Sequence, residues 1–120
     1  MNILIVDDDE FLQKSLSYYL LQAGHTVSIA VDGQAALSAI EKNKNIDALI
    51  CDVNMPQLTG PGLILTLRKF YPQGLPKIII VSGIKNGKEF MKQLDIPYDL
   101  YLEKPLDAEK VAELKAKLGN

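Results

Sequence analysis

The 120-residue sequence lacks the features that mark several common classes of protein. Its single cysteine, Cys51, excludes an internal disulfide and favours a reducing compartment. No apolar run approaches the length of a membrane span, and the acidic segment 7–10 is unlike a signal peptide. The net charge is −2 and there is no block of basic residues, so nothing favours direct binding of nucleic acid. We therefore expect a cytoplasmic protein with no direct nucleic-acid or membrane partner.

Histidine is also scarce, and so are the signs of a modular chain. The only histidine, His25, follows Gly24 in an expected turn, which argues against a catalytic or phosphate-carrying role. Repeats, linkers and low-complexity segments are missing, so residues 1–120 are expected to form one domain. For 13.3 kDa, surface scaling gives about 6,400 Å² exposed when folded, against about 19,000 Å² for the extended chain. Burial on that scale is enough for a core without disulfides or structural metal.

What the sequence does contain is a regular alternation of two hydrophobic patterns. Short apolar runs rich in β-branched residues predict buried parallel strands, and one-sided apolar faces at helical spacing predict helices that cover a sheet. The fold class is therefore α/β, a (βα)₅ doubly wound five-stranded parallel sheet of the flavodoxin-like type, for which the strand order 2-1-3-4-5 is expected. We expect strands over 3–6, 26–30, 46–51, 77–81 and 98–102, and helices over 12–23, 33–42, 60–71, 86–94 and 107–118.

Polar residues follow four of these strands at the point where each strand ends. The triplet 7–9 follows the first strand and Asp52 the third, while Ser82 and Lys104 follow the fourth and fifth. Open α/β sheets place their sites at this carboxyl edge, and the expected order puts the first and third strands side by side. Asp7 and Asp8 should therefore lie beside Asp52, provided that the chain leaves the extended form there, since neighbouring strand residues point to opposite faces.

These groups have complementary chemistry. Clustered carboxylates repel one another and are stable at neutral pH only with a cation, and an all-oxygen ligand set suits Mg²⁺ better than Zn²⁺. The Ser82 hydroxyl and the Lys104 ammonium group are suited to binding a phosphoryl group. A carboxylate nucleophile, a metal, a hydroxyl and a cation together indicate phosphoryl transfer to an aspartate. Asp9 is expected to cap the next helix instead of binding the metal.

Four sequence blocks also share their order and spacing with a known family. They are residues 3–9, residues 52–56 followed by Gly60, residues 81–83 and residues 101–105. In these blocks the chain resembles the receiver domain of bacterial two-component response regulators, and the resemblance covers essentially all of residues 1–120. It implies a phosphorylation-switched signalling domain with Mg²⁺ as its cofactor.

The resemblance also implies roles for individual residues around the metal. Asp52 would be the phospho-acceptor and a metal ligand. Asp8 would bind Mg²⁺ directly, Asp7 would hold it through water, and Asn54 would contribute its backbone carbonyl.

A second group of residues would respond to the phosphoryl group. Ser82 would bond a phosphoryl oxygen and Lys104 would bridge to Asp52 and then to the phosphoryl group. Tyr101 would be the aromatic switch, turning inward as Ser82 moves. The Lys104–Pro105 bond would be cis, which is plausible because the second residue is proline.

The expected partners follow from the same resemblance. The phosphoryl group would come from a sensor histidine kinase or a histidine phosphotransfer protein, and a downstream protein target would respond through the surface of residues 86–94, 98–102 and 107–118. The protein would be a monomer or a phosphorylation-dependent dimer. It would catalyse only its own phosphorylation and dephosphorylation, so we do not expect a conventional enzyme.

Two alternatives stay open at this point. The first is a constitutive, phosphate-independent interaction module, although such a module has no need for the complete set of acids, serine and lysine. The second is a small Mg²⁺-dependent aspartyl-phosphate phosphatase, but Asn54 stands where a second acid would be needed and no substrate-capping insertion is present. The chain ends soon after its last expected helix, which fits either a stand-alone receiver or one excised from a longer protein.

Overall fold

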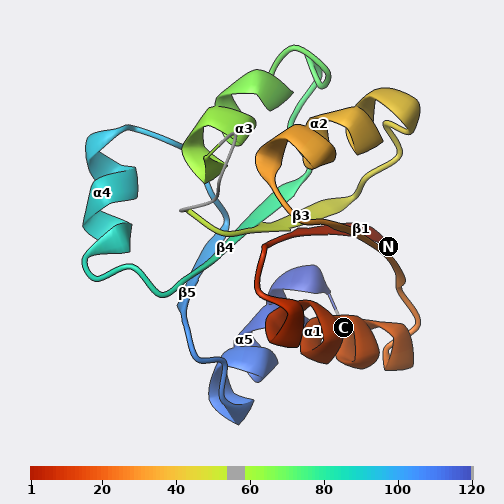
Figure 1. Cartoon of the computed structure of the whole chain (residues 1–120), viewed down its shortest axis with the longest axis vertical. Helices are drawn as coiled ribbons and strands as arrows, with labels where there is room; N and C mark the ends of the chain where they lie inside the picture. Colours follow the sequence, from red (N-terminus) through yellow and green to blue (C-terminus); the bar gives the residue numbers. More distant parts are fainter. Residues whose placement is uncertain (54–58, 120) are drawn as a thin grey trace.

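The computed structural model describes residues 1–53 and 59–119 and shows an alternating α/β chain (Figure 1). Five parallel strands form one sheet in the order β2-β1-β3-β4-β5, as the sequence predicts. The strands are β1 (Asn2–Val6), β2 (Thr26–Ala30), β3 (Ala48–Cys51), β4 (Lys77–Ser82) and β5 (Leu100–Glu103). The helices are α1 (Glu10–Gln22), α2 (Gly33–Lys42), α3 (Gly60–Leu67), α4 (Gly87–Gln93) and α5 (Ala108–Leu118).

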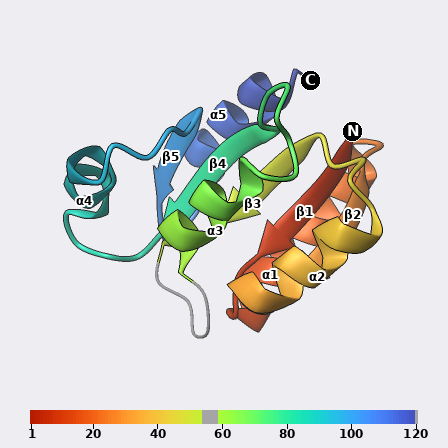
Figure 2. The same cartoon turned by 90° about the horizontal axis from the view of Figure 1, so that it is seen from above.

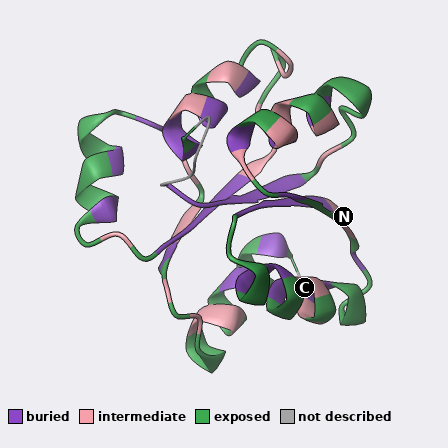
Figure 3. Ribbon diagram, in the orientation of Figure 1, coloured by how far each residue is buried: buried purple, intermediate pink, exposed green. Residues whose placement is uncertain are grey.

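The helices cover both faces of the sheet. Helices α1 and α5 lie on one face and α2 and α3 on the other, while α4 stands at the β5 end of the sheet (Figures 1 and 2). Side chains alternate along each strand, so Ile3 and Ile5 pack with α1 and α5, whereas Leu4 and Val6 pack with the opposite layer. The central strands are consequently buried along nearly all of their length, as the colouring in Figure 3 shows.

Local sequence signals explain where the helices begin. Asp9, Asp32 and Asp107 each accept a hydrogen bond from a backbone N–H in the first turn of α1, α2 and α5. The expected cap at Asp9 is thereby confirmed. Helix α1 ends beside Gly24, whose φ of 91° is the left-handed conformation that glycine adopts easily.

Most expected element boundaries agree with the structure within one residue, and the larger differences are the starts of α1, β3 and β5 and the end of α3. Strands β3 and β5 begin two residues late, because Asp47 and Asp99 turn their carboxylates to the N–H groups of Asn2 and Ile78, both at 2.7 Å. Helix α3 ends at Leu67 instead of near residue 71. Beyond it the chain tightens into i→i+3 hydrogen bonds, and the residue before Pro72 is disfavoured in a helix.

No helix in the described ranges is long and apolar enough to cross a membrane.

Candidate phosphoryl-acceptor site

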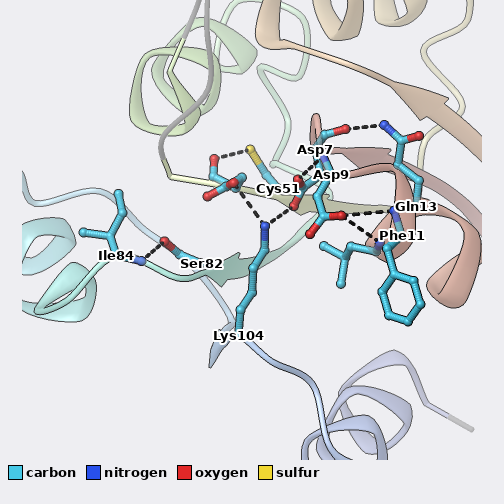
Figure 4. Close-up of polar contacts among 10 residues, drawn as sticks. Asp7, Asp9, Phe11, Gln13, Cys51, Ser82, Ile84 and Lys104 are labelled. Carbon is cyan, nitrogen blue, oxygen red and sulfur yellow. Dashed lines mark hydrogen bonds and ion pairs between the residues drawn. The ribbon is translucent and has the colours of Figure 1, made fainter.

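Four functional side chains meet at the carboxyl edge of the sheet because the strands that carry them are in register. Val6 pairs with Cys51, which pairs with Ile80 in turn, so the residues that follow β1 and β3 start from the same level. Asp7 and Asp52 are buried, with 1% and 7% of their surface exposed, and Ser82 is fully buried. Lys104 follows β5 and reaches back over the edge, as Figure 4 shows.

The acidic residues come together because the chain leaves the sheet at Asp7. The Asp7 N–H still bonds to the Ala30 carbonyl of β2 at 3.1 Å, but the Asp7 carboxylate then accepts the Asp9 N–H at 2.9 Å and closes a turn. As a result, ligand oxygens of Asp7, Asp8 and Asp52 all lie within 4.8 Å of one another. An all-carboxylate set of this kind fits a hard divalent cation such as Mg²⁺.

Lys104 links the two buried acids. Its Nζ lies 2.9 Å from Asp7 Oδ2 and 3.3 Å from Asp52 Oδ2. Burial favours a neutral amine, but the two carboxylates outweigh it and raise the pKa of Lys104, so the ammonium form is retained. Burial also raises the pKa of Asp7, and the Asp9 N–H and Lys104 offset this effect only in part. The free-energy cost of keeping Asp7 ionised is therefore only partly offset within the cluster, and a bound cation would lower it further.

Ser82 and Tyr101 lie on the β4–β5 side of the site. The Ser82 Oγ accepts the Ile84 N–H at 3.1 Å, and the Ser82 carbonyl accepts the Lys104 N–H at 2.9 Å, which fixes the two strand ends together. The Tyr101 hydroxyl is buried beside Gly87, and its ring meets Tyr98 edge-on at 5.9 Å between centroids. Burial raises the pKa of Tyr101, against the opposing effect of the nearby Ser82 hydroxyl. The Tyr101 hydroxyl is thus turned inward, toward the start of α4.

Two glycines allow close approaches that no other residue permits. A Cβ on Gly60 would overlap the carbonyl oxygen of Asp52, and one on Gly87 would overlap the hydroxyl of Tyr101. The Gly60 N–H also bonds to the Val53 carbonyl at 3.1 Å, so the start of α3 is tied to the segment that follows β3. Glycine at these positions lets α3 and α4 start against the site.

The structure brings together nearly every predicted site residue. Asp7, Asp8, Asp52 and Lys104 form one cluster, Ser82 and Tyr101 flank it, and the Lys104–Pro105 bond is cis as expected. Asn54 lies outside the described residues. Cys51 is a core residue that is 1% exposed. Its burial raises the pKa of its thiol, and its Sγ donates to the Asp52 carbonyl.

Sequence reasoning missed one contact at the site. The Gln13 side chain donates to the backbone carbonyl of Asp7 from the buried face of α1 (Figure 4). The available signal was a polar residue on a helical face otherwise formed by Leu12, Leu16 and Leu20.

The fold and this acidic edge define a class of signalling domain, and comparison with known sequences places the chain within it. The family model of the response regulator receiver domain matches residues 3–115. The chain therefore belongs to the receiver domains of two-component response regulators, which act as phosphorylation-switched signalling domains and have no classical enzyme activity.

Individual relatives agree with this assignment. The chain is 36% identical to the transcriptional regulatory protein PrrA of Mycobacterium tuberculosis over 117 residues, which are 97% of this chain and 49% of PrrA. It spans about half the length of the curated relatives it matches.

Solved structures show the same fold. The chemotaxis protein CheY4 of Vibrio cholerae is 26% identical with a TM-score of 0.83, covering 97% of this chain and 96% of CheY4. The response regulator TrrA of Thermotoga maritima, solved in complex with Mg²⁺ and BeF, is 25% identical with a TM-score of 0.78, covering 98% of this chain and 97% of TrrA.

Proposed function

We propose that Asp52 is the phospho-acceptor of this receiver domain and that Asp7, Asp8 and Asp52 hold Mg²⁺ during the transfer. The observation that carries the proposal is the bridge from the Lys104 ammonium to both Asp52 and Asp7, within a cluster of three carboxylates. The cation would neutralise charge on the transferring phosphoryl oxygens. The presence of Mg²⁺ in the complex of TrrA supports this assignment.

The proposed transfer balances as a single displacement. An Asp52 carboxylate oxygen forms the new bond to phosphorus while the bond from phosphorus to a histidine nitrogen of the donor breaks, and the electron pair stays with that nitrogen. Lys104, freed from part of its contact with Asp52, would pair with a phosphoryl oxygen. The Ser82 hydroxyl accepts the Ile84 N–H at 3.1 Å, so its proton is available to a second phosphoryl oxygen. Hydrolysis by water would reverse the switch, and both steps would act only on the protein itself.

The phosphodonor would be a histidine kinase or a histidine phosphotransfer protein, and a groove beside the site supports a protein donor. The groove runs between α1 and the start of α5, and Lys104 lies among the residues that line it. Its outer wall carries Phe11 and Tyr18, which are 81% and 70% exposed. Large apolar side chains left in solvent next to a reactive edge are typical of a docking surface.

The response would pass to a downstream protein through α4, β5 and α5. Phosphorylation removes one carboxylate and adds a dianion, which draws Ser82 and Lys104 toward one point. Both residues lie at the ends of strands that border α4 and α5. The same proposal includes a cytoplasmic location and a single receiver domain over residues 1–120. The protein would be a monomer or a phosphorylation-dependent dimer and would act on a downstream protein target.

Mass spectrometry tests the acceptor directly. Incubation with Mg²⁺ and acetyl phosphate should add one phosphoryl group to the wild-type protein, and hydroxylamine should remove it, because an acyl phosphate is labile to that nucleophile. Asp52→Asn should show no gain. Asp95→Asn is the matched control, since Asp95 is exposed and its φ of 54° is tolerated by asparagine.

An unmodified wild-type protein would contradict the proposal if beryllofluoride with Mg²⁺ also failed to bind. In that case a phosphate-independent interaction module would be the better description of this receiver fold.

A further inference from the structure

Gln13 is a buried polar side chain that the phosphoryl-transfer chemistry described above does not use. It lies in the first turns of α1 with 9% of its surface exposed, and it is the one polar member of the helix's buried set. Its Nε2 donates to the backbone carbonyl of Asp7 (Figure 4). Glutamine buries less apolar surface at this position than leucine would, and its amide must be hydrogen-bonded to be buried without a large cost. The hydrogen bond to Asp7 is therefore the feature that distinguishes Gln13 from the leucines beside it.

The Asp7 carbonyl is the point where the chain stops behaving as a strand. The preceding groups are still in the ladder, since the Val6 carbonyl accepts the Asp52 N–H and the Asp7 N–H bonds to Ala30, both at 3.1 Å. A continuing strand would give the Asp7 carbonyl to a neighbouring strand. Here Gln13 takes it instead, and the turn closed by Asp9 takes the Asp7 carboxylate. Both polar ends of Asp7 are therefore held by the start of α1.

This bend decides whether the acids converge. In an extended chain the side chains of Asp7 and Asp8 would point to opposite faces of the sheet, yet their oxygens lie together with those of Asp52 within 4.8 Å. We propose that Gln13 is a positioning residue for the cation site, because its hydrogen bond holds the Asp7–Asp8 peptide in the turned conformation. The inference rests on the proposed function, since it concerns the same Mg²⁺ site.

The test replaces Gln13 with an unbranched side chain that cannot donate. Gln13→Met should weaken Mg²⁺ binding about tenfold, the lower end of the effects found when a residue that orients metal ligands is removed. Binding is measured on the unphosphorylated protein by titrating Mg²⁺ and following the backbone amide resonances of Asp8 and Asp9. Gln22→Met, an exposed change on the same helix, should bind Mg²⁺ like the wild type.

A stability control separates positioning from general weakening of the fold. Leu114→Ala removes a fully buried side chain from α5 and should lower the thermal midpoint at least as much as Gln13→Met, yet leave the Mg²⁺ dissociation constant within twofold. Gln13→Met binding within twofold of the wild type would overturn the inference and leave the proposed function standing. A wild-type protein that bound no Mg²⁺ would overturn both.

The wild-type protein supplies a second measurement in case Gln13→Met does not fold. Saturation with Mg²⁺ should shift the side-chain amide resonances of Gln13, because the carbonyl they bond to belongs to the segment that binds the cation. Side-chain resonances of Gln13 that did not move while those of Asp8 did would overturn the positioning role.

Discussion

Asp7 is a buried carboxylate whose ionisation costs folding free energy. Its carboxylate is buried, and the resulting rise in its pKa exceeds the lowering effects of the Asp9 N–H and Lys104. Such a carboxylate binds protons more readily when folded than when unfolded, so the folding free energy depends on pH. Protonated Asp7 therefore stabilises the folded state at acid pH, and this stabilisation is lost as pH rises through the raised pKa of Asp7.

Asp7→Asn should therefore stabilise the metal-free protein at neutral pH. The amide keeps the shape of the side chain and removes the buried charge, so the urea midpoint at neutral pH should rise. The midpoint of the variant should also decrease less than that of the wild type as pH is raised from acid to neutral. The measurement is urea unfolding in chelator across that pH range, with Asp95→Asn as the exposed control. An Asp7→Asn protein that is less stable at neutral pH and keeps the wild-type slope would contradict the argument.

Mg²⁺ should reverse the order of the two proteins. A ligand at one hundred times its dissociation constant stabilises a folded protein by about 2.7 kcal/mol, and the wild type should gain on this scale. Asp7→Asn should gain much less, because it lacks one of the carboxylates of the cluster. Equal gains in thermal midpoint for both proteins would show that the cation binds elsewhere.

Helix α4 is a short helix whose first turn packs against Tyr101. Among the residues of α4 only Gly87 and Met91 are buried, and Asn86 caps the helix from a left-handed conformation without a side-chain hydrogen bond. The Tyr101 hydroxyl packs against its first turn and would overlap a Cβ on residue 87. The start of α4 and the inward tyrosine are thus mutually dependent.

Gly87→Ala should force Tyr101 out or displace the first turn of α4, at a cost of about 1 to 3 kcal/mol for an overpacked site. Spectrophotometric titration of the tyrosines should show one phenol whose pKa returns toward the ordinary value, because Tyr101 would gain contact with water. In a Tyr101→Ala background the same change should be neutral or stabilising, since alanine is the better helix former by about 1 kcal/mol. A cost that persisted in that background would place the clash elsewhere.

The two-sided core sets the stability of the whole molecule, and neighbouring leucines in α3 give a matched test of it. Leu63 is fully buried while Leu65 is 47% exposed. Leu63→Ala should lower the free energy of unfolding by about 2 to 5 kcal/mol, as large-to-small core changes do. Leu65→Ala should change it by less than about 1 kcal/mol. Urea unfolding of both variants checks the difference, and equal losses would contradict the assigned layer of α3.

Much of this molecule could be predicted from its sequence, because the central strands are short apolar runs buried in the core and four of the five strands end at or directly before a polar site residue. The strand order and the meeting of Asp7, Asp52 and Lys104 at one edge followed from that pattern and are confirmed. The late starts of β3 and β5 did not follow, since they depend on side chains that reach across to another strand. The contact of Gly87 with Tyr101 depends on how closely α4 approaches the sheet, which no local pattern records, whereas Gln13 is marked in the sequence only as a polar residue on an apolar helix face.

The segment 7–13 has a consequence for how the domain can diverge. It runs from Asp7 and Asp8, the proposed cation ligands, through the helix cap at Asp9 to Phe11, the most exposed large apolar side chain lining the groove, and on to Gln13. If the groove is the docking surface proposed above, inherited changes that alter which partner is recognised would arise within a few positions of changes that alter the proposed chemistry. Phe11 is 81% exposed, whereas Asp9 caps α1 and Gln13 bonds to the Asp7 carbonyl. Substitution of Phe11 would therefore change the groove while leaving the cap and the Gln13 bond in place.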